Sequence, residues 1–539
     1  MRMAWLMRDA GVSCPFSRTD RRSPNRSRFG RWTLAAGALA AFAASAAPGQ
    51  SLDRKVAMAI DKARLGAARI GVSILDCQTG VELVSVHPPA SANANGAGFT
   101  PASNLKLLTS GTAACILGPD YEFRTELFYD KGRVIVKGCG DPGFADPELL
   151  EKMHMSLDQF FDGLLESMTK TRVVELREVI VDDRVFDREY VHPDWPVEQL
   201  NRAYCAQVSG LNFYANILNV YVSPGPHIND LAVARSEPSG SWMRIQSLAK
   251  TVASKGEATT GVWLERDNKE PYAFRLFGTV RTALDTPIQV TVNEPNLMFA
   301  KVLADRLIRS GLGNPASPPQ TRLCLPDEEL SEVGQALGVA RTKIGVVLER
   351  CNVDSDNLYA ESLIKAAGHK LTGQPGSWSN GTAAVRMELK ELVNGDMAAQ
   401  LIMADGSGLS RNNRVTPEMI TRWLRAMAAK PVVGDVFVHS LAIAGEEGTL
   451  RKRFKGAKLH NEVRAKSGYI TKVRTLSGYV INAATGRRVA FSVLVDELPS
   501  GDDQRAKELH ENIVEAIDDW LFNQTRNAPA VPAGAGADR

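Results

Sequence analysis

The chain has 539 residues, 44% of them hydrophobic and 23% charged, which is typical of a globular protein with roughly two to four domains. Residues 1–46 carry eight arginines against two aspartates, so the formal net charge of +3 arises in this segment and the remainder is slightly acidic. Without a net positive charge beyond residue 46, the composition excludes nucleic acid as the expected partner.

Residues 1–46 predict an export signal peptide. An arginine-rich stretch precedes an alanine-rich apolar run at 32–47 that ends in small residues. The run is too short and too weakly apolar to span a bilayer, so we expect an exported, periplasmic protein with no transmembrane anchor once the signal is removed. The export route stays open, because Arg21 and Arg22 suggest a twin-arginine signal but no large apolar pair follows them. A basic leader with no role in export is the alternative.

Residues 47–120 predict the first part of an α/β domain. Apolar residues at helical spacing predict a helix over 52–66, and two strands are predicted over 70–75 and 81–86, joined by a turn at Gly80. Residues 121–284 are dominated by short strands and predict a large β-rich insert with one amphipathic helix over 148–169. The clearest strands of the insert are predicted over 133–136, 179–182, 217–222 and 273–277.

Residues 285–523 predict the second part of the same α/β domain. Helical patterning resumes at Pro295, and three strands are predicted over 463–470, 475–481 and 488–495. The final helix is predicted over 503–522, where apolar residues recur on one stripe that can pack on a sheet. Residues 524–539 are rich in alanine, proline and glycine and predict a disordered tail.

The cysteines permit disulfides without choosing among them. Once Cys14 is removed with the signal, an even number remains and many pairings are possible. No Cys-x-x-Cys or His-Glu-x-x-His spacing occurs, so we expect no metal site. The mechanism expected below needs no organic cofactor either. The remaining cysteines are Cys77, Cys115, Cys139, Cys205, Cys324 and Cys351.

The first motif, Ser103-x-x-Lys106, predicts a nucleophile and its base. Pro101 suits the entry to a helix, so Ser103 is expected in the first turn, where backbone N–H groups and the positive end of the helix dipole favour an oxyanion. Lys106 is one turn on and on the same face. Burial and a second lysine would lower its pKa enough for it to act as a base. The alternative is a capping serine beside a solvated lysine, since Ser-x-x-Lys also occurs elsewhere, for example at Ser247/Lys250.

The second motif, Ser355-Asp356-Asn357, precedes an apolar helical pattern that begins at Leu358. It is therefore expected to open a helix. In the functional interpretation, Ser355 relays a proton between Lys106 and a leaving amine, and Asn357 holds a substrate amide. The alternative is a helix cap without chemistry, because these residue types are also good caps.

The third motif, Lys466-Ser467-Gly468, falls in a predicted strand. An edge strand can pair with an extended peptide through its backbone. Lys466 and the Ser467 hydroxyl would then bind a terminal carboxylate, and Gly468 would let the backbone approach closely. The N–H groups of Ser103 and Tyr469 are the expected donors of an oxyanion hole. The alternative is a surface turn.

Together and in this order, the three motifs carry a family resemblance. The chain resembles the D-alanyl-D-alanine carboxypeptidase/endopeptidase family of the penicillin-binding protein 4 type over most of its length. Further stretches that support the resemblance are 138–142, 208–212, 405–411 and 445–451. We assign the glycine-rich 405–411 stretch to shaping the site rather than to chemistry.

The resemblance implies a penicillin-binding-protein/β-lactamase-like transpeptidase domain, an antiparallel sheet flanked by helices, with a large insert. It also implies a serine DD-peptidase that hydrolyses D-Ala-D-Ala carboxypeptide bonds, peptide cross-links or both in bacterial peptidoglycan, through an acyl-enzyme on Ser103. Peptidoglycan stem peptides are the implied substrates and β-lactam antibiotics the implied inhibitors. Two departures are Ser467, where threonine is more usual, and the bulky Tyr469 beside the expected oxyanion hole, which is expected to narrow the substrate range.

Two other functions share the motifs. A serine β-lactamase would be much shorter, and no Glu-x-Glu-Leu-Asn lies between Ser103 and Ser355. A non-catalytic wall-binding protein of the same fold would retain costly buried polar residues without using them. The sequence does not decide between carboxypeptidase and endopeptidase activity.

Overall fold

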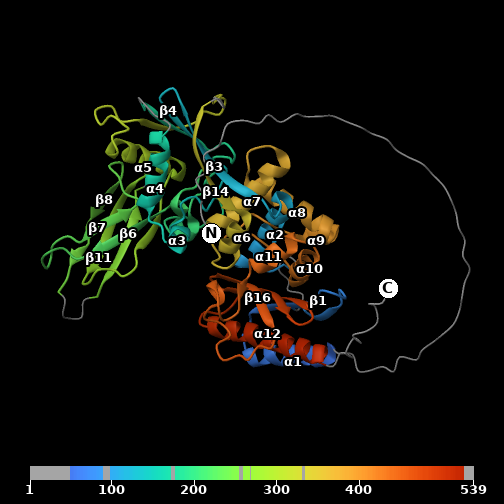
Figure 1. Cartoon of the computed structure of the whole chain (residues 1–539). Coiled ribbons are helices and arrows are strands. Elements are labelled where there is room, and N and C mark those ends of the chain that lie inside the picture. Colours follow the sequence, from blue (N-terminus) through green and yellow to red (C-terminus); the bar gives the residue numbers. More distant parts are fainter. Residues whose placement is uncertain are drawn as a thin grey trace, which may run out of the picture.

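The computed structural model describes residues 49–88, 98–170, 176–253, 259–267, 269–330 and 334–526. The predicted signal peptide (residues 1–46) and the predicted tail from residue 527 onward lie outside these ranges. No helix within them combines the length and the apolarity needed to cross a membrane. The described chain forms two lobes, one around a six-stranded sheet and one of smaller sheets (Figure 1).

The six-stranded sheet is antiparallel throughout, with the strand order β15-β16-β17-β18-β1-β2. The first and the last strand of the described chain are neighbours in this sheet, because β1 pairs with β18 from Arg69↔Asp496 to Asp76↔Val489. The five strands predicted in this region are confirmed to within two residues at each end. The strands are β1 (Arg69–Asp76), β2 (Glu82–Val86), β15 (Ala442–Ile443), β16 (Glu462–Ile470), β17 (Val473–Ile481) and β18 (Arg488–Asp496).

Helices cover both faces of this sheet (Figure 1). On one face, the predicted apolar stripe of the last helix shares a core with Phe491 and Val493 of β18. On the other face, Ala490 and Leu494 belong to the core of the helices that carry the site. Successive side chains of a strand point to opposite faces of the sheet, so alternate residues of β18 pack into two different hydrophobic cores. The first face has α1 (Gly49–Ala63) and α12 (Asp503–Arg526); the second has α2 (Lys106–Leu117), α6 (Ile344–Asn352), α7 (Asn357–Thr372), α8 (Trp378–Leu392), α9 (Gly395–Gln400), α10 (Pro417–Ala428) and α11 (Val433–His439).

The insert contains three small sheets around a shared core. Their orders are β13-β5-β4-β3-β14, β12-β6-β7 and β10-β11-β8, with β9 also paired to β11. Phe144, Phe161 and Phe299 pack together within the core of this lobe. The strands are β3 (Glu122–Asp130), β4 (Arg133–Lys137), β5 (Glu178–Asp182), β6 (Ile217–Ser223), β7 (Val233–Glu237), β8 (Arg244–Ser247), β9 (Lys250–Thr251), β10 (Gly261–Arg266), β11 (Ala273–Val280), β12 (Ile288–Thr291), β13 (Gln320–Leu323) and β14 (Gln335–Lys343).

Two details of the insert differ from the sequence-based expectation. The single helix expected over 148–169 is wrong, because the chain forms α3 (Pro147–Lys152) and α4 (Leu157–Lys170), with His154 at φ +53° between them. In addition, α5 (Pro295–Arg309) packs in the core of the insert although it follows the expected boundary at residue 284. Since β14 also pairs with β3, we propose that the insert continues to the end of β14.

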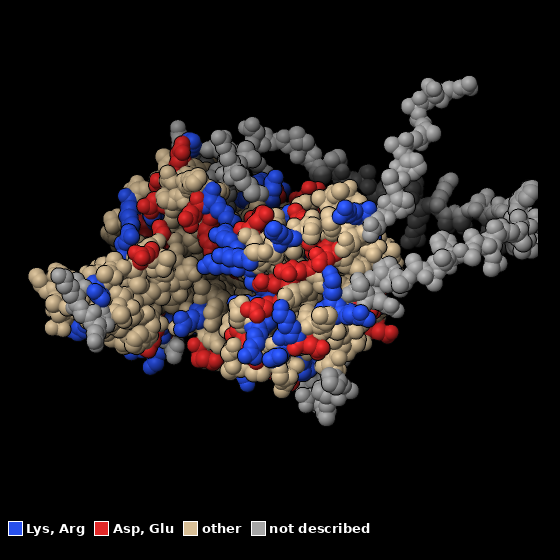
Figure 2. Space-filling model, turned by 90° about the horizontal axis from the view of Figure 1, so that it is seen from below, with Lys and Arg blue, Asp and Glu red and all other residues tan. Residues whose placement is uncertain are grey.

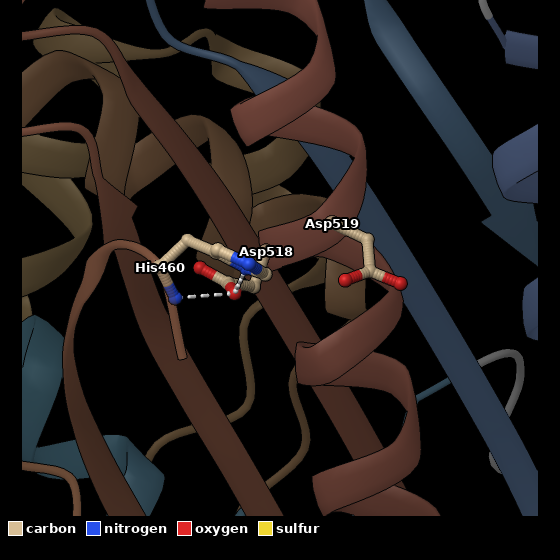
Figure 3. Close-up of side chains that lie close together, drawn as sticks. All are labelled: His460, Asp518 and Asp519. Atoms are coloured by element: carbon tan, nitrogen blue, oxygen red, sulfur yellow. Dashed lines mark hydrogen bonds and ion pairs between the residues drawn. The ribbon is translucent and has the colours of Figure 1, made fainter. Parts of the chain in front are cut away.

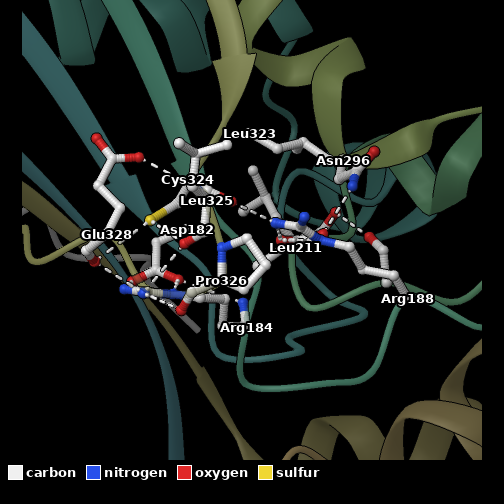
Figure 4. Close-up of polar contacts among 12 residues, drawn as sticks. Asp182, Arg184, Arg188, Leu211, Asn296, Leu323, Cys324, Leu325, Pro326 and Glu328 are labelled. Atoms are coloured by element: carbon white, nitrogen blue, oxygen red, sulfur yellow. Dashed lines mark hydrogen bonds and ion pairs between the residues drawn. The ribbon is translucent and has the colours of Figure 1, made fainter.

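Residues 524–526, which were expected in the disordered tail, belong to α12, which continues to Arg526. The six cysteines of the described chain are all free thiols, so the structure joins none of them in a disulfide. Cys324 lies in a polar cluster after β13, where Arg184 donates to the backbone oxygens of the 325–328 segment (Figure 4). On the surface, lysines and arginines are interspersed with aspartates and glutamates on the face shown in Figure 2.

Candidate active site

The proposed nucleophile lies in a short 3-10 turn, η1 (Ala102–Leu105), which runs directly into α2. Ser103 is therefore one turn before the α-helix proper rather than in its first turn, as predicted, and it is half-buried. Its neighbour Asn104 is fully buried and donates from Nδ2 to the carbonyl oxygen of Lys466, at 2.6 Å. This contact ties the turn to β16, so two of the three sequence motifs are in direct contact.

Lys106 is fully buried, and its amine has three polar neighbours. Nζ lies 3.1 Å from the Oγ of Ser103, 2.6 Å from the Oδ1 of Asn357 and 3.0 Å from the carbonyl oxygen of Ser407. Burial lowers the pKa of Lys106 from its usual value, and nearby acidic groups oppose that shift. Burial, one of the two predicted causes, is therefore the main cause of the lowered pKa of Lys106, whereas repulsion from the second lysine, Lys466, is not among its largest causes.

Ser355 lies opposite Lys466, with 2.8 Å between its Oγ and the lysine Nζ. It precedes α7 in a left-handed conformation, at φ +64°, which is uncommon for a residue with a side chain. Asp356 is the N-cap of α7, and Asn357 is the first residue of the helix, as the sequence predicted. The amide of Asn357 contacts Lys106 through Oδ1 and donates from Nδ2 to the carbonyl oxygen of Tyr204, at 2.8 Å.

Lys466 is fully buried in the middle of β16, and its Nζ also donates to the carbonyl oxygen of Ser467 at 2.9 Å. Burial, followed by repulsion from Lys106, lowers the pKa of Lys466 well below its usual value. The Oγ of Ser467 lies 2.8 Å from the Oγ1 of Thr449, in the 3-10 turn η5 (Gly448–Leu450). Thr449 lies in the 445–451 stretch that supports the family resemblance, but no role was predicted for it.

One edge of β16 is open beside these groups. The short strand β15 pairs only with Arg464 and Ala465, so residues 466–470 have no strand of the described chain on that side. Ala444 N donates to the carbonyl oxygen of Val463 on the same side. Because the two-residue period puts the backbone groups of 463, 465, 467 and 469 on one edge, the N–H of Tyr469 lies there too.

Gly468 lies where β16 packs closely against η1, the turn that carries the proposed nucleophile. A Cβ at this position would lie 3.1 Å from both Pro101 O and Ser103 N, and 2.1 Å from the Oγ1 of Thr475. Only a residue without a side chain allows that approach. The ring of Tyr469 is 60% exposed and stacks on the guanidinium of Arg474, which lies 3.3 Å from the ring centroid.

A group of metal-ligand type, His460, Asp518 and Asp519, lies on and beside α12 (Figure 3). Its carboxylates already have protein partners. Asp518 accepts hydrogen bonds from the backbone N–H groups of His460 and Asn461, at 2.8 and 2.9 Å. Asp519 forms an ion pair with Lys55 at 2.9 Å. These contacts give the cluster a structural role, because they hold the segment before β16 against α12.

Comparison with known proteins gives a consistent set of relatives. Residues 52–522 match the D-Ala-D-Ala carboxypeptidase 3 (S13) family. The chain is 29% identical over 458 residues to a D-alanyl-D-alanine carboxypeptidase of an Actinomadura species, covering 80% of this chain and 78% of the relative. It is 24% identical over 430 residues to the D-alanyl-D-alanine carboxypeptidase DacB of Haemophilus influenzae, covering 76% and 83% of the two chains.

Among solved structures, penicillin-binding protein 4 of Haemophilus influenzae superposes with a TM-score of 0.66 at 21% identity, covering 87% of this chain and 99% of that chain. A likeness at this level of identity establishes a shared fold. It confirms the predicted α/β architecture of the penicillin-binding-protein type.

Proposed function

Because the chain belongs to the D-Ala-D-Ala carboxypeptidase 3 (S13) family, and is therefore a serine-type D-Ala-D-Ala carboxypeptidase, we propose that Ser103 is its nucleophile and Lys106 its general base. The observation that carries the assignment is the 3.1 Å separation of Lys106 Nζ from Ser103 Oγ at a buried amine of lowered pKa. A group acting as a base must reach the proton that it abstracts, and here it does.

Burial favours the basic form of Lys106. A neutral amine has two hydrogens and one lone pair. Its two hydrogens are accepted by Asn357 Oδ1 and the Ser407 carbonyl oxygen, so the lone pair is left for the Ser103 hydroxyl. Ser103 then attacks the carbonyl carbon of the penultimate D-Ala and forms the acyl-enzyme, while its proton passes to Lys106.

The N–H groups of Ser103 and Tyr469 would hold the oxyanion of the tetrahedral intermediate. The close approach at Gly468 and the open edge of β16 support this assignment. The substrate peptide would lie along that edge as an extra strand.

Ser355 and Lys466 would return the proton to the departing D-Ala amine. Their 2.8 Å contact and the lowered pKa of Lys466 support that role. Lys466, Ser467 and Gly468 would hold the terminal carboxylate, and Thr449 would orient the Ser467 hydroxyl. Water then hydrolyses the acyl-enzyme on Ser103.

The cellular setting is proposed on the same basis. We place the protein in the periplasm, exported by the signal at residues 1–46, with peptidoglycan stem peptides as substrates and β-lactam antibiotics as inhibitors. A structure of penicillin-binding protein 4 of Haemophilus influenzae is a complex with a β-lactam, which supports inhibition by that class. Carboxypeptide bonds, peptide cross-links or both are the bonds cleaved.

The test is the intact mass of the protein after incubation with benzylpenicillin. We expect a penicilloyl adduct on the wild type and on Ser247→Ala, a matched Ser-x-x-Lys serine in the insert, and none on Ser103→Ala. An adduct on Ser103→Ala would overturn the nucleophile. Rapid loss of the drug without an adduct would favour a β-lactamase, and intact drug without an adduct would favour a non-catalytic wall-binding protein.

A further inference from the structure

A fully buried carboxylate, that of Glu361, lies behind the proposed base. Glu361 is on α7, one turn after Asn357, and its carboxylate faces the backbone of the 405–410 loop. Oε2 accepts from Gly406 N at 2.7 Å, and Oε1 accepts from Ser407 N at 2.8 Å. The indole N–H of Trp378 also donates to Oε2, at 2.8 Å. One side chain therefore holds two consecutive peptide N–H groups.

The same loop is fixed from its other sides. Thr109 on α2, one turn after Lys106, donates from Oγ1 to the carbonyl oxygen of Gly406 at 2.7 Å. Gly408 adopts φ +85°, and a Cβ there would lie 1.9 Å from the carbonyl oxygen of Ala102. The loop is thus packed between α7 and the nucleophile turn. Its one contact with the base is the Ser407 carbonyl, 3.0 Å from the Lys106 amine.

We propose that Glu361 is a positioning residue for the deprotonation of Ser103, because it fixes the Ser407 carbonyl that accepts one hydrogen of Lys106. This inference rests on the proposed role of Lys106 as the base. With the Ser407 carbonyl out of place, the Lys106 amine would be free to rotate and its lone pair would no longer be directed at Ser103. Glu361 itself touches neither Ser103 nor the Lys106 amine, so it acts through the loop.

The charge of Glu361 gives the proposal a second readout. Burial, and then the nearby Asp405, raise the pKa of Glu361 to about 7. The ionised form of Glu361 favours the ammonium form of Lys106, as do Asp405 and Asp356. Lys365, one turn further along α7, and Cys351 on α6 are the further titratable groups that interact with Glu361. Removing the Glu361 charge should therefore lower the pKa of Lys106 and move the acid limb of acylation to lower pH.

The experiment compares Glu361→Gln with Glu388→Gln, a buried glutamate on the adjacent helix α8 that interacts with Glu391, Lys430 and Cys115. Acylation by benzylpenicillin is followed by mass over a range of drug concentrations and pH. In Glu361→Gln, an NH₂ group faces peptide N–H donors, so we expect the saturating acylation rate to fall by about 10- to 100-fold. The half-saturating drug concentration should stay within about twofold, and the control should match the wild type.

Thr109→Val provides the second variant, because it removes the side-chain anchor on the carbonyl oxygen of Gly406, next to Ser407, with little change of shape. If Glu361→Gln does not fold, as judged by circular dichroism, a fall in the saturating rate of Thr109→Val supports the proposal and an unchanged rate overturns it. The proposal is also overturned if Glu361→Gln folds and keeps the wild-type saturating acylation rate, or if only its half-saturating drug concentration changes. Absence of acylation in the wild type would instead overturn the proposed function.

Discussion

Gly468→Ala should separate β16 from η1, the turn that carries the proposed nucleophile Ser103. The added Cβ would lie 2.1 Å from Thr475 Oγ1, more than an ångström inside ordinary contact distance, and 3.1 Å from Ser103 N. Thr475 cannot easily rotate away, because it is β-branched and its hydroxyl donates to Pro101 O at 2.9 Å. Strand and turn must therefore move apart.

The crowding around the added Cβ sets the expected losses of stability and of acylation rate. Overpacking of a tight core position typically costs about 1–3 kcal/mol of stability, and misplacement of reacting groups by about 1 Å costs about 100-fold in rate. Thr475→Ala alone loses one buried hydrogen bond, about 1 kcal/mol. The double variant removes the shortest clash, so its destabilisation should be smaller than the sum of the two single changes by about 1 kcal/mol or more.

The assays are urea unfolding and the rate of penicilloyl adduct formation. Gly345→Ala is the matched control, because a Cβ at Gly345 on α6 meets nothing within 4 Å. That variant should acylate like the wild type and be no less stable in urea. If Gly468→Ala did the same, or if the Gly468 and Thr475 changes were additive, the reasoning about this contact would be wrong.

Three further changes test other parts of the structure. His510 is fully buried with neither ring nitrogen hydrogen-bonded, and burial lowers its pKa well below the usual value, so the folded state binds fewer protons than the unfolded state below about pH 6.5. Urea unfolding should therefore show the wild type losing up to about 1.4 kcal/mol per pH unit relative to His510→Phe as the pH falls below that value. Ser467→Ala should raise the KM for a D-Ala-D-Ala peptide about 10-fold, and Ser467→Thr should restore it, in steady-state assays; an unchanged KM would remove Ser467 from carboxylate binding. Acylation of the wild type should rise with pH through the lowered pKa of Lys106, whereas Lys106→Arg should be inactive at every pH, because a guanidinium stays charged; an active arginine variant would contradict the base.

The strands of the central sheet were predicted well because they are marked by runs of apolar residues. β18 is buried along almost its whole length, and its run of apolar residues leaves little choice of structure. The break between α3 and α4 was missed because residues 152–156 contain neither glycine nor proline. There the structure places His154 at φ +53° and begins α4 after Ser156, whose Oγ accepts from Gln159 N.

The site residues were predicted from motifs, and the structure brings Ser103, Lys106 and Asn357 together across a long stretch of sequence. The Ser407 carbonyl could not be predicted in this way, since every residue has a carbonyl group and only the fold decides where it points. Glu361 was missed because a glutamate on a helix normally lies in solvent. Its burial depends on α7 packing against the 405–410 loop, which no local pattern reports.

The arrangement around Lys106 also supports its proposed role as the base, because the amine is held in place without a carboxylate in direct contact. The atoms in contact with its amine are a hydroxyl, an amide oxygen and a peptide carbonyl oxygen, none of which carries a charge. A carboxylate in direct contact would favour the ammonium form and so remove the base. Glu361 instead contacts the peptide N–H groups behind the Ser407 carbonyl. Neutral acceptors orient the amine, and the buried charge that fixes them stays one peptide group away.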